Sequence, residues 1–315
     1  MGNLATMSEA KADDVYVKSI AVAYDGILSP PSCEYDKPYL LLVVLSSTRN
    51  FERRMTIRDT IGKIRQHRGR NIRLAFMTMR TNIPVIEKKL QSESTAYRDI
   101  IQAKFNEAYR NLTLKTLESF KWTIMKCPSA KFMFKVDDDV IFFSRNIVDY
   151  SLKLESENRT FVYEGDFAKK YGPSLPSRDP KHKWYISEQD FNNKTFPGYI
   201  LGYAVLFSRD TVHALYRASF HVPRVFGTPR HRFPIEDVFT GVCAKYSHIT
   251  PRQSPQIHLN VSKFEGKTKN DQCAVLQELA VHGIGQAKMK QLFDESEHQR
   301  TNGICFLGNA LSSAM

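Results

Sequence analysis

Long apolar runs alternate with amphipathic segments through the first half of the chain. Residues 40–45 are continuously apolar, which is typical of a strand buried on both faces of a sheet. Shorter apolar runs over residues 72–77 and 132–136 predict two further strands. Apolar positions at helical spacing predict helices over residues 52–67 and 97–125. This β-α-β-α-β order predicts an α/β fold in which helices cover a mostly parallel sheet and binding groups lie at the carboxyl ends of strands.

The flanks of this region predict the domain organisation. Residues 1–36 are polar, contain two adjacent prolines and show no sustained period, so we expect a loose N-terminal segment. We expect residues 37–295 to form a single large domain and residues 296–315 to form a C-terminal tail. A length of 315 residues suits this organisation, and 42% apolar with 25% charged residues excludes a wholly disordered or coiled-coil chain.

The chain carries a surplus of positive charge. Lys and Arg number 45 and Asp and Glu number 33, which gives a formal net charge of +12. Such a surplus favours an anionic partner: nucleic acid, an acidic membrane face or a phosphorylated small molecule. The basic residues are scattered, and the sequence has neither zinc-finger spacing nor an RNA-binding aromatic motif. We therefore expect no nucleic-acid partner.

Cysteines, sequons and apolar runs bear on the cell compartment. The five cysteines contain no C-x-x-C pair, so we expect no structural zinc site, and an oxidising compartment would allow two disulfides and one free thiol. N-x-S/T sequons, which would matter only in the secretory pathway, begin at Asn111, Asn158, Asn193 and Asn260. The longest apolar run, residues 39–45, is far shorter than the roughly 20 residues that span a bilayer. Residues 1–18 lack the hydrophobic region of a signal peptide, so we expect a soluble chain without a targeting segment.

Three consecutive carboxylates, Asp137 to Asp139, stand between apolar flanks. Burying such charges without a partner would cost several kcal/mol each. A divalent cation would neutralise them, and hard carboxylate oxygens suit Mg²⁺ or Mn²⁺. The alternative is a solvated acidic turn after a strand, and the motif alone does not choose between the two.

A second acidic pair, Glu236 and Asp237, lies in an apolar setting. Desolvation raises the pKa of a carboxyl group, so this pair is a candidate general base. The alternative is a helix N-terminus where acidic residues offset the dipole, and both interpretations can hold together. The sequence contains no phosphate-binding glycine loop and no G-x-S-x-G motif, which disfavours P-loop enzymes and serine hydrolases.

These motifs occur with others in a fixed order. In chain order they are an arginine motif at residues 54–62, a tyrosine–asparagine stretch at 105–116, the acidic turn at 137–140, an aromatic–glycine stretch at 196–202, the acidic pair motif at 236–241, Cys273, and a Val–His pair at 281–282. Each is weak alone, but their order and spacing are specific. Over residues 39–290 the chain resembles the β-1,3-galactosyltransferase-like family of inverting, UDP-sugar-dependent enzymes.

The resemblance implies a GT-A-like, Rossmann-type fold and a site for a nucleotide sugar and a metal ion. It implies that Asp139 and His282 bind Mn²⁺, since a carboxylate–imidazole site fits Mn²⁺ better than Mg²⁺. Asp137 and Asp138 would face the ribose and the surroundings of the metal. The donor diphosphate would pair with the arginine motif, at Arg54 and Arg58, where a guanidinium suits phosphate geometry.

The resemblance also implies the reaction and its setting. Asp237 would act as general base and Glu236 would orient the acceptor, so that a hexose, with galactose favoured, passes from a UDP-sugar to a glycan hydroxyl in β-1,3 linkage. Relatives are anchored Golgi proteins, which implies the lumenal face of the Golgi membrane and an anchor that this chain does not show. Trp184 resembles an acceptor-side aromatic position, although a buried structural tryptophan is an equal alternative. The family pattern suggests a disulfide between Cys243 and Cys273.

Departures from the family pattern leave other functions open. Ile61 replaces a tryptophan, Lys104 stands where an acidic residue is usual, and Met77–Thr78 falls where the family has Leu–Gly. One alternative is therefore a weak or inactive relative that only binds glycans or nucleotide sugars. A second is a different donor, UDP-N-acetylglucosamine or UDP-N-acetylgalactosamine. A third is a metal-dependent phosphoryl-transfer enzyme or nuclease, which the acidic turn and positive charge would suit.

Overall fold

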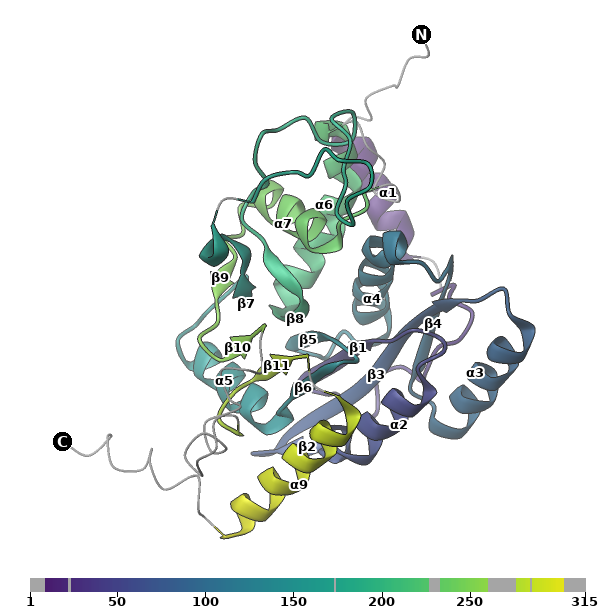
Figure 1. The fold of residues 1–315 in the computed structure, drawn as a ribbon, viewed down its shortest axis with the longest axis vertical. Coiled ribbons are helices and arrows are strands. Elements are labelled where there is room, and N and C mark those ends of the chain that lie inside the picture. Colours follow the sequence, from purple (N-terminus) through teal and green to yellow (C-terminus); the bar gives the residue numbers. More distant parts are fainter. Residues whose placement is uncertain are drawn as a thin grey trace, which may run out of the picture.

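The computed structural model describes residues 9–21, 24–172, 174–226, 233–259, 276–283 and 285–302. Its centre is a mixed sheet in which four neighbouring strands run parallel, in the order β4-β3-β1-β5, followed by β8, β7 and β9 (Figure 1). Strand β8 is antiparallel to both β5 and β7. The strands are β1 (Leu40–Leu45), β2 (Gln66–His67), β3 (Arg70–Arg80), β4 (Ile100–Asn106), β5 (Phe132–Asp137), β7 (Tyr163–Phe167), β8 (Ile200–Ser208) and β9 (Arg252–Gln253).

Helices cover both faces of this sheet. One hydrophobic cluster joins α4, α6 and α7 to one face, and a second joins α2, α5 and α9 to the other. The helices are α1 (Glu9–Ala21), α2 (Phe51–Asp59), α3 (Pro84–Tyr97), α4 (Leu112–Lys126), α5 (Ser144–Ser156), α6 (Arg209–Phe226), α7 (Glu236–Tyr246) and α9 (Gln286–Asn302). The predicted α/β architecture, a mostly parallel sheet flanked by helices, is confirmed.

The register of β1 explains its continuous apolar sequence. Leu40, Leu42 and Val44 belong to one cluster, whereas the alternate residues of the strand belong to the other. Since side chains alternate between the two faces of a strand, a strand covered by helices on both sides must be apolar throughout. The strands predicted over residues 72–77 and 132–136 are also confirmed, as parts of β3 and β5.

The long helix predicted over residues 97–125 is wrong. Helix α3 ends at Tyr97, Arg98 takes a left-handed conformation with φ 53°, and β4 follows before α4 begins at Leu112. Ile101 and Phe105 are four residues apart, a spacing that fits one face of a strand as well as one face of a helix.

A small second sheet brings the C-terminal part of the domain to the end of β5. It contains β6 (Val140–Phe142), β10 (Ile257–His258) and β11 (Ala280–His282). Strand β11 is antiparallel to β6, with His282 opposite Val140. The residue before Val140 in the acidic turn therefore lies beside His282.

The N-terminal segment, predicted to be loose, is held against the domain where the structure describes it. Tyr16 of α1 packs against Tyr216 and Phe220 of α6. Further along, Cys33 forms a disulfide with Cys127, which follows α4. At the other end of the chain, α9 continues to Asn302, past the predicted domain boundary at residue 295.

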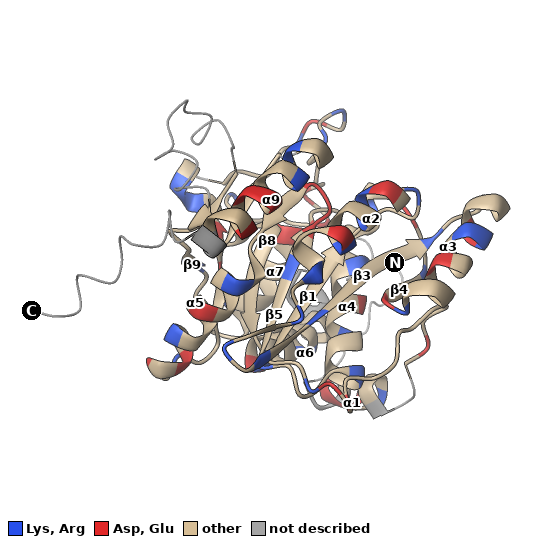
Figure 2. Ribbon diagram, turned by 90° about the horizontal axis from the view of Figure 1, so that it is seen from below, with Lys and Arg blue, Asp and Glu red and all other residues tan. Residues whose placement is uncertain are grey.

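Other sequence-based predictions have mixed outcomes. Cys273 lies outside the described residues, so its predicted pairing with Cys243 stays a prediction. No helix in the described ranges combines the length and apolar character that a membrane span requires. Lys and Arg residues are spread over many helices and loops, as the sequence indicated (Figure 2).

Candidate active site

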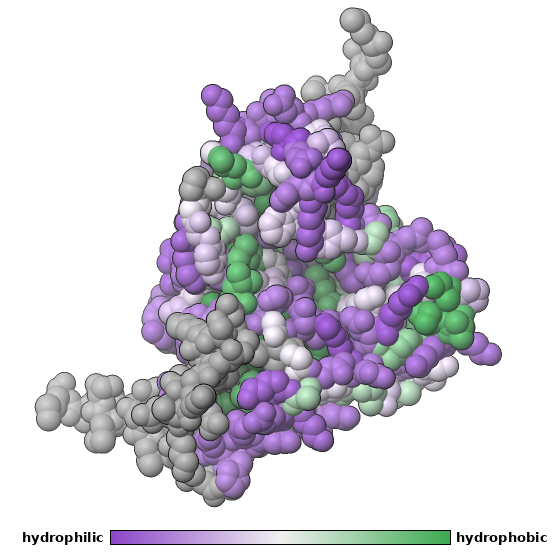
Figure 3. Space-filling model, viewed as in Figure 1, coloured by the Kyte–Doolittle hydropathy of each residue, from purple (hydrophilic) through white to green (hydrophobic). Residues whose placement is uncertain are grey.

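A cavity of about 730 Å³ opens where β5 ends and α7 begins. The face shown in Figure 1 is hollowed near its centre in the space-filling view (Figure 3). Five of the eight residues proposed from the sequence line the cavity: Asp137, Asp139, Glu236, Asp237 and His282. They come from three separate parts of the chain, which only the fold brings together.

His282 and Asp139 are the two residues expected from the sequence to bind a metal ion. The β6–β11 register places His282 Nε2 3.6 Å from Asp139 Oδ1, and the Tyr203 ring packs against the imidazole at 5.1 Å between ring centres. Across the described ranges, no group of three or more His, Cys, Asp or Glu side chains is arranged to hold a metal ion. The described part of the protein therefore offers two potential ligands here rather than a complete coordination shell.

Asp137 is the last residue of β5 and lines the same cavity. Burial raises the pKa of its carboxyl group to about 7, against an opposing effect of the Lys135 ammonium. The nearby charges of Glu236 and Asp139 raise the pKa further. Removing solvent disfavours the charged form, so this carboxylate would gain from a cation or a hydrogen-bond donor on a ligand.

Asp138 points away from the cavity. Its carboxylate accepts hydrogen bonds from Ser46 Oγ at 2.7 Å, Asn50 Nδ2 at 2.8 Å and Arg53 Nη1 at 2.9 Å. These contacts join the acidic turn to the loop after β1 and to α2. In this structure the Asp138 carboxylate holds the acidic turn in place, and its expected role near the ribose stays a prediction.

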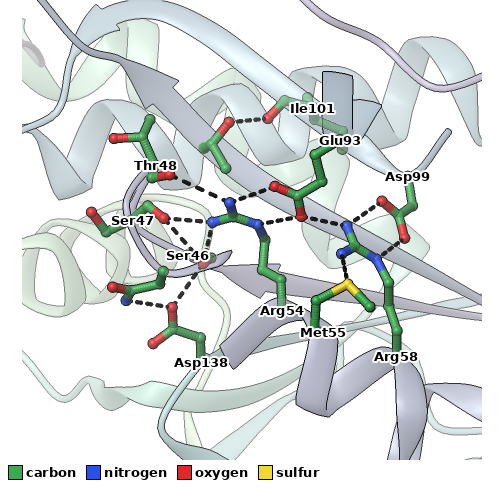
Figure 4. A network of polar contacts seen from close by, with 12 residues as sticks. Ser46, Ser47, Thr48, Arg54, Met55, Arg58, Glu93, Asp99, Ile101 and Asp138 are labelled. Atoms are coloured by element: carbon green, nitrogen blue, oxygen red, sulfur yellow. Dashed lines mark hydrogen bonds and ion pairs between the residues drawn. The ribbon is translucent and has the colours of Figure 1, made fainter. Parts of the chain in front are cut away.

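Arg54 and Arg58 are engaged by carboxylates instead of facing the cavity (Figure 4). Arg54 is fully buried and donates to both carboxylate oxygens of Glu93, at 2.8 and 2.7 Å. Arg58 pairs with Glu93 at 2.8 Å and binds Asp99 through two hydrogen bonds of 2.8 Å. These guanidinium groups tie α2 to α3 and to the residue before β4, and the diphosphate contacts expected for both arginines stay a prediction.

Glu236 and Asp237 form the first turn of α7, so the helix-terminus interpretation is correct. The Asp237 carboxylate accepts a hydrogen bond from the Val238 backbone N–H at 2.8 Å. Burial, together with the neighbouring Glu236 charge, raises the pKa of Asp237 to about 7. A carboxyl group with this pKa can accept a proton near neutral pH, so the general-base interpretation is also physically possible.

Comparison with known proteins now adds to this geometry. Residues 52–255 match the family described as Galactosyltransferase. The chain belongs to the galactosyltransferase family. It is 29% identical to human beta-1,3-galactosyltransferase 5 over 273 residues, which cover 87% of this chain and 83% of that protein. The Pan troglodytes protein of the same name is 31% identical over 82% of this chain and 81% of its own.

Two further similarities are more distant. Mouse beta-1,3-galactosyltransferase 1 is 26% identical over 87% of this chain and 78% of its own. The solved apo structure of the bifunctional glycosyltransferase WbbM aligns with 86% of this chain and 50% of its own, at 9% identity. The TM-score of this alignment is 0.43.

A buried cation that was not predicted from the sequence lies beside the acidic pair of this galactosyltransferase-family chain. Lys135 lies in the middle of β5, and its side chain is 1% exposed. Its Nζ lies 3.3 Å from Glu236 Oε1 and donates to the Gly202 carbonyl. Thr116 of α4 donates to the same Glu236 oxygen at 2.9 Å. A lysine inside the otherwise apolar run of residues 132–136 was the sequence signal for this contact.

An aromatic pair lines the mouth of the cavity. Trp184 Nε1 donates to Tyr109 Oη at 3.0 Å, and the Lys183 ammonium lies 4.7 Å from the centre of the Tyr109 ring. Trp184 is 53% exposed and Tyr109 is 47% exposed, so neither is a buried structural residue. Ring faces of this kind are available for stacking against a sugar.

The departures from the family pattern lie outside the cavity lining. Ile61 is buried in the hydrophobic cluster on the α2 side of the sheet. Lys104 is on the surface, where its ammonium pairs with Asp25 at 3.1 Å. Neither substitution alters a residue that lines the cavity.

Proposed function

We propose that this protein is an inverting UDP-sugar glycosyltransferase that moves galactose to a glycan hydroxyl in β-1,3 linkage. The main support is the convergence of Asp139, His282 and Asp237 on one cavity from three distant segments. Membership of the galactosyltransferase family supports sugar transfer over phosphoryl transfer. The names of the relatives favour galactose and the β-1,3 linkage.

Asp139 and His282 fit a divalent cation. Mg²⁺ and Mn²⁺ are commonly held by one or two protein groups, with substrate phosphates and water completing the shell, and an imidazole ligand favours Mn²⁺. The Nε2–Oδ1 separation of 3.6 Å allows both groups to contact one ion. When bound, the cation would neutralise charge on the departing diphosphate.

The proposed chemistry is a single displacement in which Asp237 is the base. Its carboxylate takes the proton of an acceptor hydroxyl while that oxygen bonds to the anomeric carbon of the donor sugar. The bond from this carbon to the diphosphate breaks, and UDP leaves with the electron pair. Attack from the opposite side converts an α-linked nucleotide sugar into a β-glycoside. Tyr109 and Trp184 would hold the acceptor by stacking at the mouth of the cavity.

A donor screen with a mutant control tests this function. We expect transfer from UDP-galactose in preference to UDP-N-acetylglucosamine and UDP-N-acetylgalactosamine, with a β-configured product. Asp237→Asn removes the base and should lower kcat by about 10²- to 10⁴-fold while UDP binding changes little. Asp149→Asn, a change outside the cavity lining, is the control. Absence of transfer from every donor, or full turnover by Asp237→Asn, would refute the assignment.

The cell location follows from the same proposal. The relatives are galactosyltransferases, and we propose that the protein acts at the lumenal face of the Golgi membrane. The Cys33–Cys127 disulfide supports an oxidising compartment, since such bonds are rare in reducing ones. Imaging the tagged full-length protein with a Golgi marker is the direct test, and a diffuse cytosolic signal would contradict this location.

A further inference from the structure

Lys135 occupies an unfavourable position that needs a reason. It lies in the central strand β5, with Val43 of β1 on one side and Val205 of β8 on the other. Its side chain shares a face of the strand with Asp137, because side chains two residues apart point the same way. Burying an ammonium group costs several kcal/mol unless it is paired and hydrogen-bonded.

The partners of Lys135 converge on one side chain of α7. Its ammonium pairs with Glu236 Oε1 and donates to the Gly202 carbonyl, while Thr116 donates to Glu236 Oε1. Gly202 also packs closely against this carboxylate, leaving no space for a β-carbon. We call Lys135, Thr116 and Gly202 the Glu236 clamp. Its members come from β5, α4 and β8, so three separate elements hold one carboxylate.

The clamp acts on the first turn of α7, which has no side-chain cap. Helix N-termini are usually secured by a Ser, Thr, Asp or Asn side chain at the N-cap position. Residue Ile235 occupies that position in α7 and makes no side-chain cap hydrogen bond. The clamp therefore secures the first turn of α7 through Glu236, and this turn carries Asp237.

We propose that Lys135 and Thr116 are positioning residues for glycosyl transfer, holding Glu236 so that the adjacent Asp237 carboxylate faces the acceptor hydroxyl. This inference rests on the proposed function. It also changes the role of Glu236, whose Oε1 is directed toward the clamp. Errors of about 1 Å in the position of a reacting group can cost 10²-fold in rate, so a loosened clamp should lower kcat.

Thr116→Val is the sharpest test because it changes neither charge nor size. Loss of one hydrogen bond to a charged group should lower kcat about tenfold while KM for the UDP-sugar stays within about twofold. Thr116→Ser keeps the hydroxyl and should restore kcat. Thr123→Val is the matched control, since Thr123 lies on the same helix, is buried and donates to the Ser119 carbonyl.

The variant Lys135→Met is a second test of the positioning role. It should lower kcat by more than Thr116→Val, because it leaves the Glu236 carboxylate without its cation. Lys121→Met is its control: Lys121 lies on α4, is also buried and pairs with Asp25 at 2.7 Å, and neither residue lines the cavity. This control should lose thermal stability but keep kcat within about threefold.

The outcomes separate the two proposals. Equal kcat for Thr116→Val and Thr123→Val in an active enzyme would overturn the positioning role alone. Absence of sugar transfer by the wild-type protein would overturn the proposed function, and the positioning role with it. If Lys135→Met does not fold, the Thr116 variants still decide the question, because they retain every charge of the clamp.

Discussion

Replacing Gly202 by alanine should disable the enzyme by displacing a single carboxylate. Real β-carbons essentially never approach another heavy atom closer than 3.0 Å, but a β-carbon at this position would lie closer than that to Glu236 Oε2. It would also lie 3.5 Å from Asp237 Cβ. The Gly202 backbone is not in the left-handed region, so the cost is steric. The Glu236 carboxylate must move by more than about half an ångström. Because Asp237 lies in the same first turn of α7, a shift of its carboxylate approaching 1 Å would lower kcat by about 10²-fold.

Gly165→Ala is the control for this prediction. Its β-carbon would clash with Ile200 and with the Ala204 carbonyl, which are not carboxylates of the site. Overpacking of this kind costs about 1–3 kcal/mol of stability, so both variants should unfold at lower temperature. Steady-state kinetics at saturating donor should then show a large fall in kcat only for Gly202→Ala. Similar kcat values for the two variants would refute the steric argument.

Three further predictions concern pH, metal and the disulfide. Since burial raises the pKa of Asp237 from 3.8 to about 7, kcat/KM should fall as pH drops below about 7, and a flat profile between pH 5.5 and 8 would contradict its role as base. UDP at 100 times its Kd should stabilise the protein by about 2.7 kcal/mol with Mn²⁺ and much less with EDTA. Asp139→Asn or His282→Ala should remove the Mn²⁺-dependent part of this thermal shift, and its persistence in both would exclude the proposed ligands. Cys33→Ser should lower the free energy of unfolding by up to about 4.7 kcal/mol, because the disulfide to Cys127 closes a loop with a sequence separation of 94. Equal free energies of unfolding for the mutant and the oxidised wild type, measured by chemical denaturation, would contradict this.

Some residues were placed correctly by local pattern because their environment is local. The apolar run of β1 predicted a strand covered on both faces, and the acidic turn was correctly placed at the end of the third predicted strand. The pair Glu236–Asp237 was correctly interpreted as a possible helix start. Hydrophobic periodicity and burial depend on neighbouring residues, so a short stretch of sequence is enough to predict them.

Side-chain partners within the protein could not be predicted from local pattern. The sequence offered Arg54 and Arg58 as phosphate ligands, but Glu93 and Asp99 occupy their guanidinium groups. An arginine fork suits a carboxylate as well as a phosphate, and residue type alone does not say which anion lies nearby. Nothing local in the sequence indicated which carboxylate Lys135 would pair with.

By itself, the sequence determined the alternation of strands and helices and the chemical character of each candidate residue. The tertiary structure decided which residues share a cavity: the antiparallel register of β6 and β11 puts His282 beside Asp139, and the packing of α7 against β8 brings Asp237 to the same place. Strand pairing and helix packing join residues more than 100 positions apart, and their energies depend on the whole core. The local periodicity of the sequence therefore does not specify which strands pair or which helices pack together.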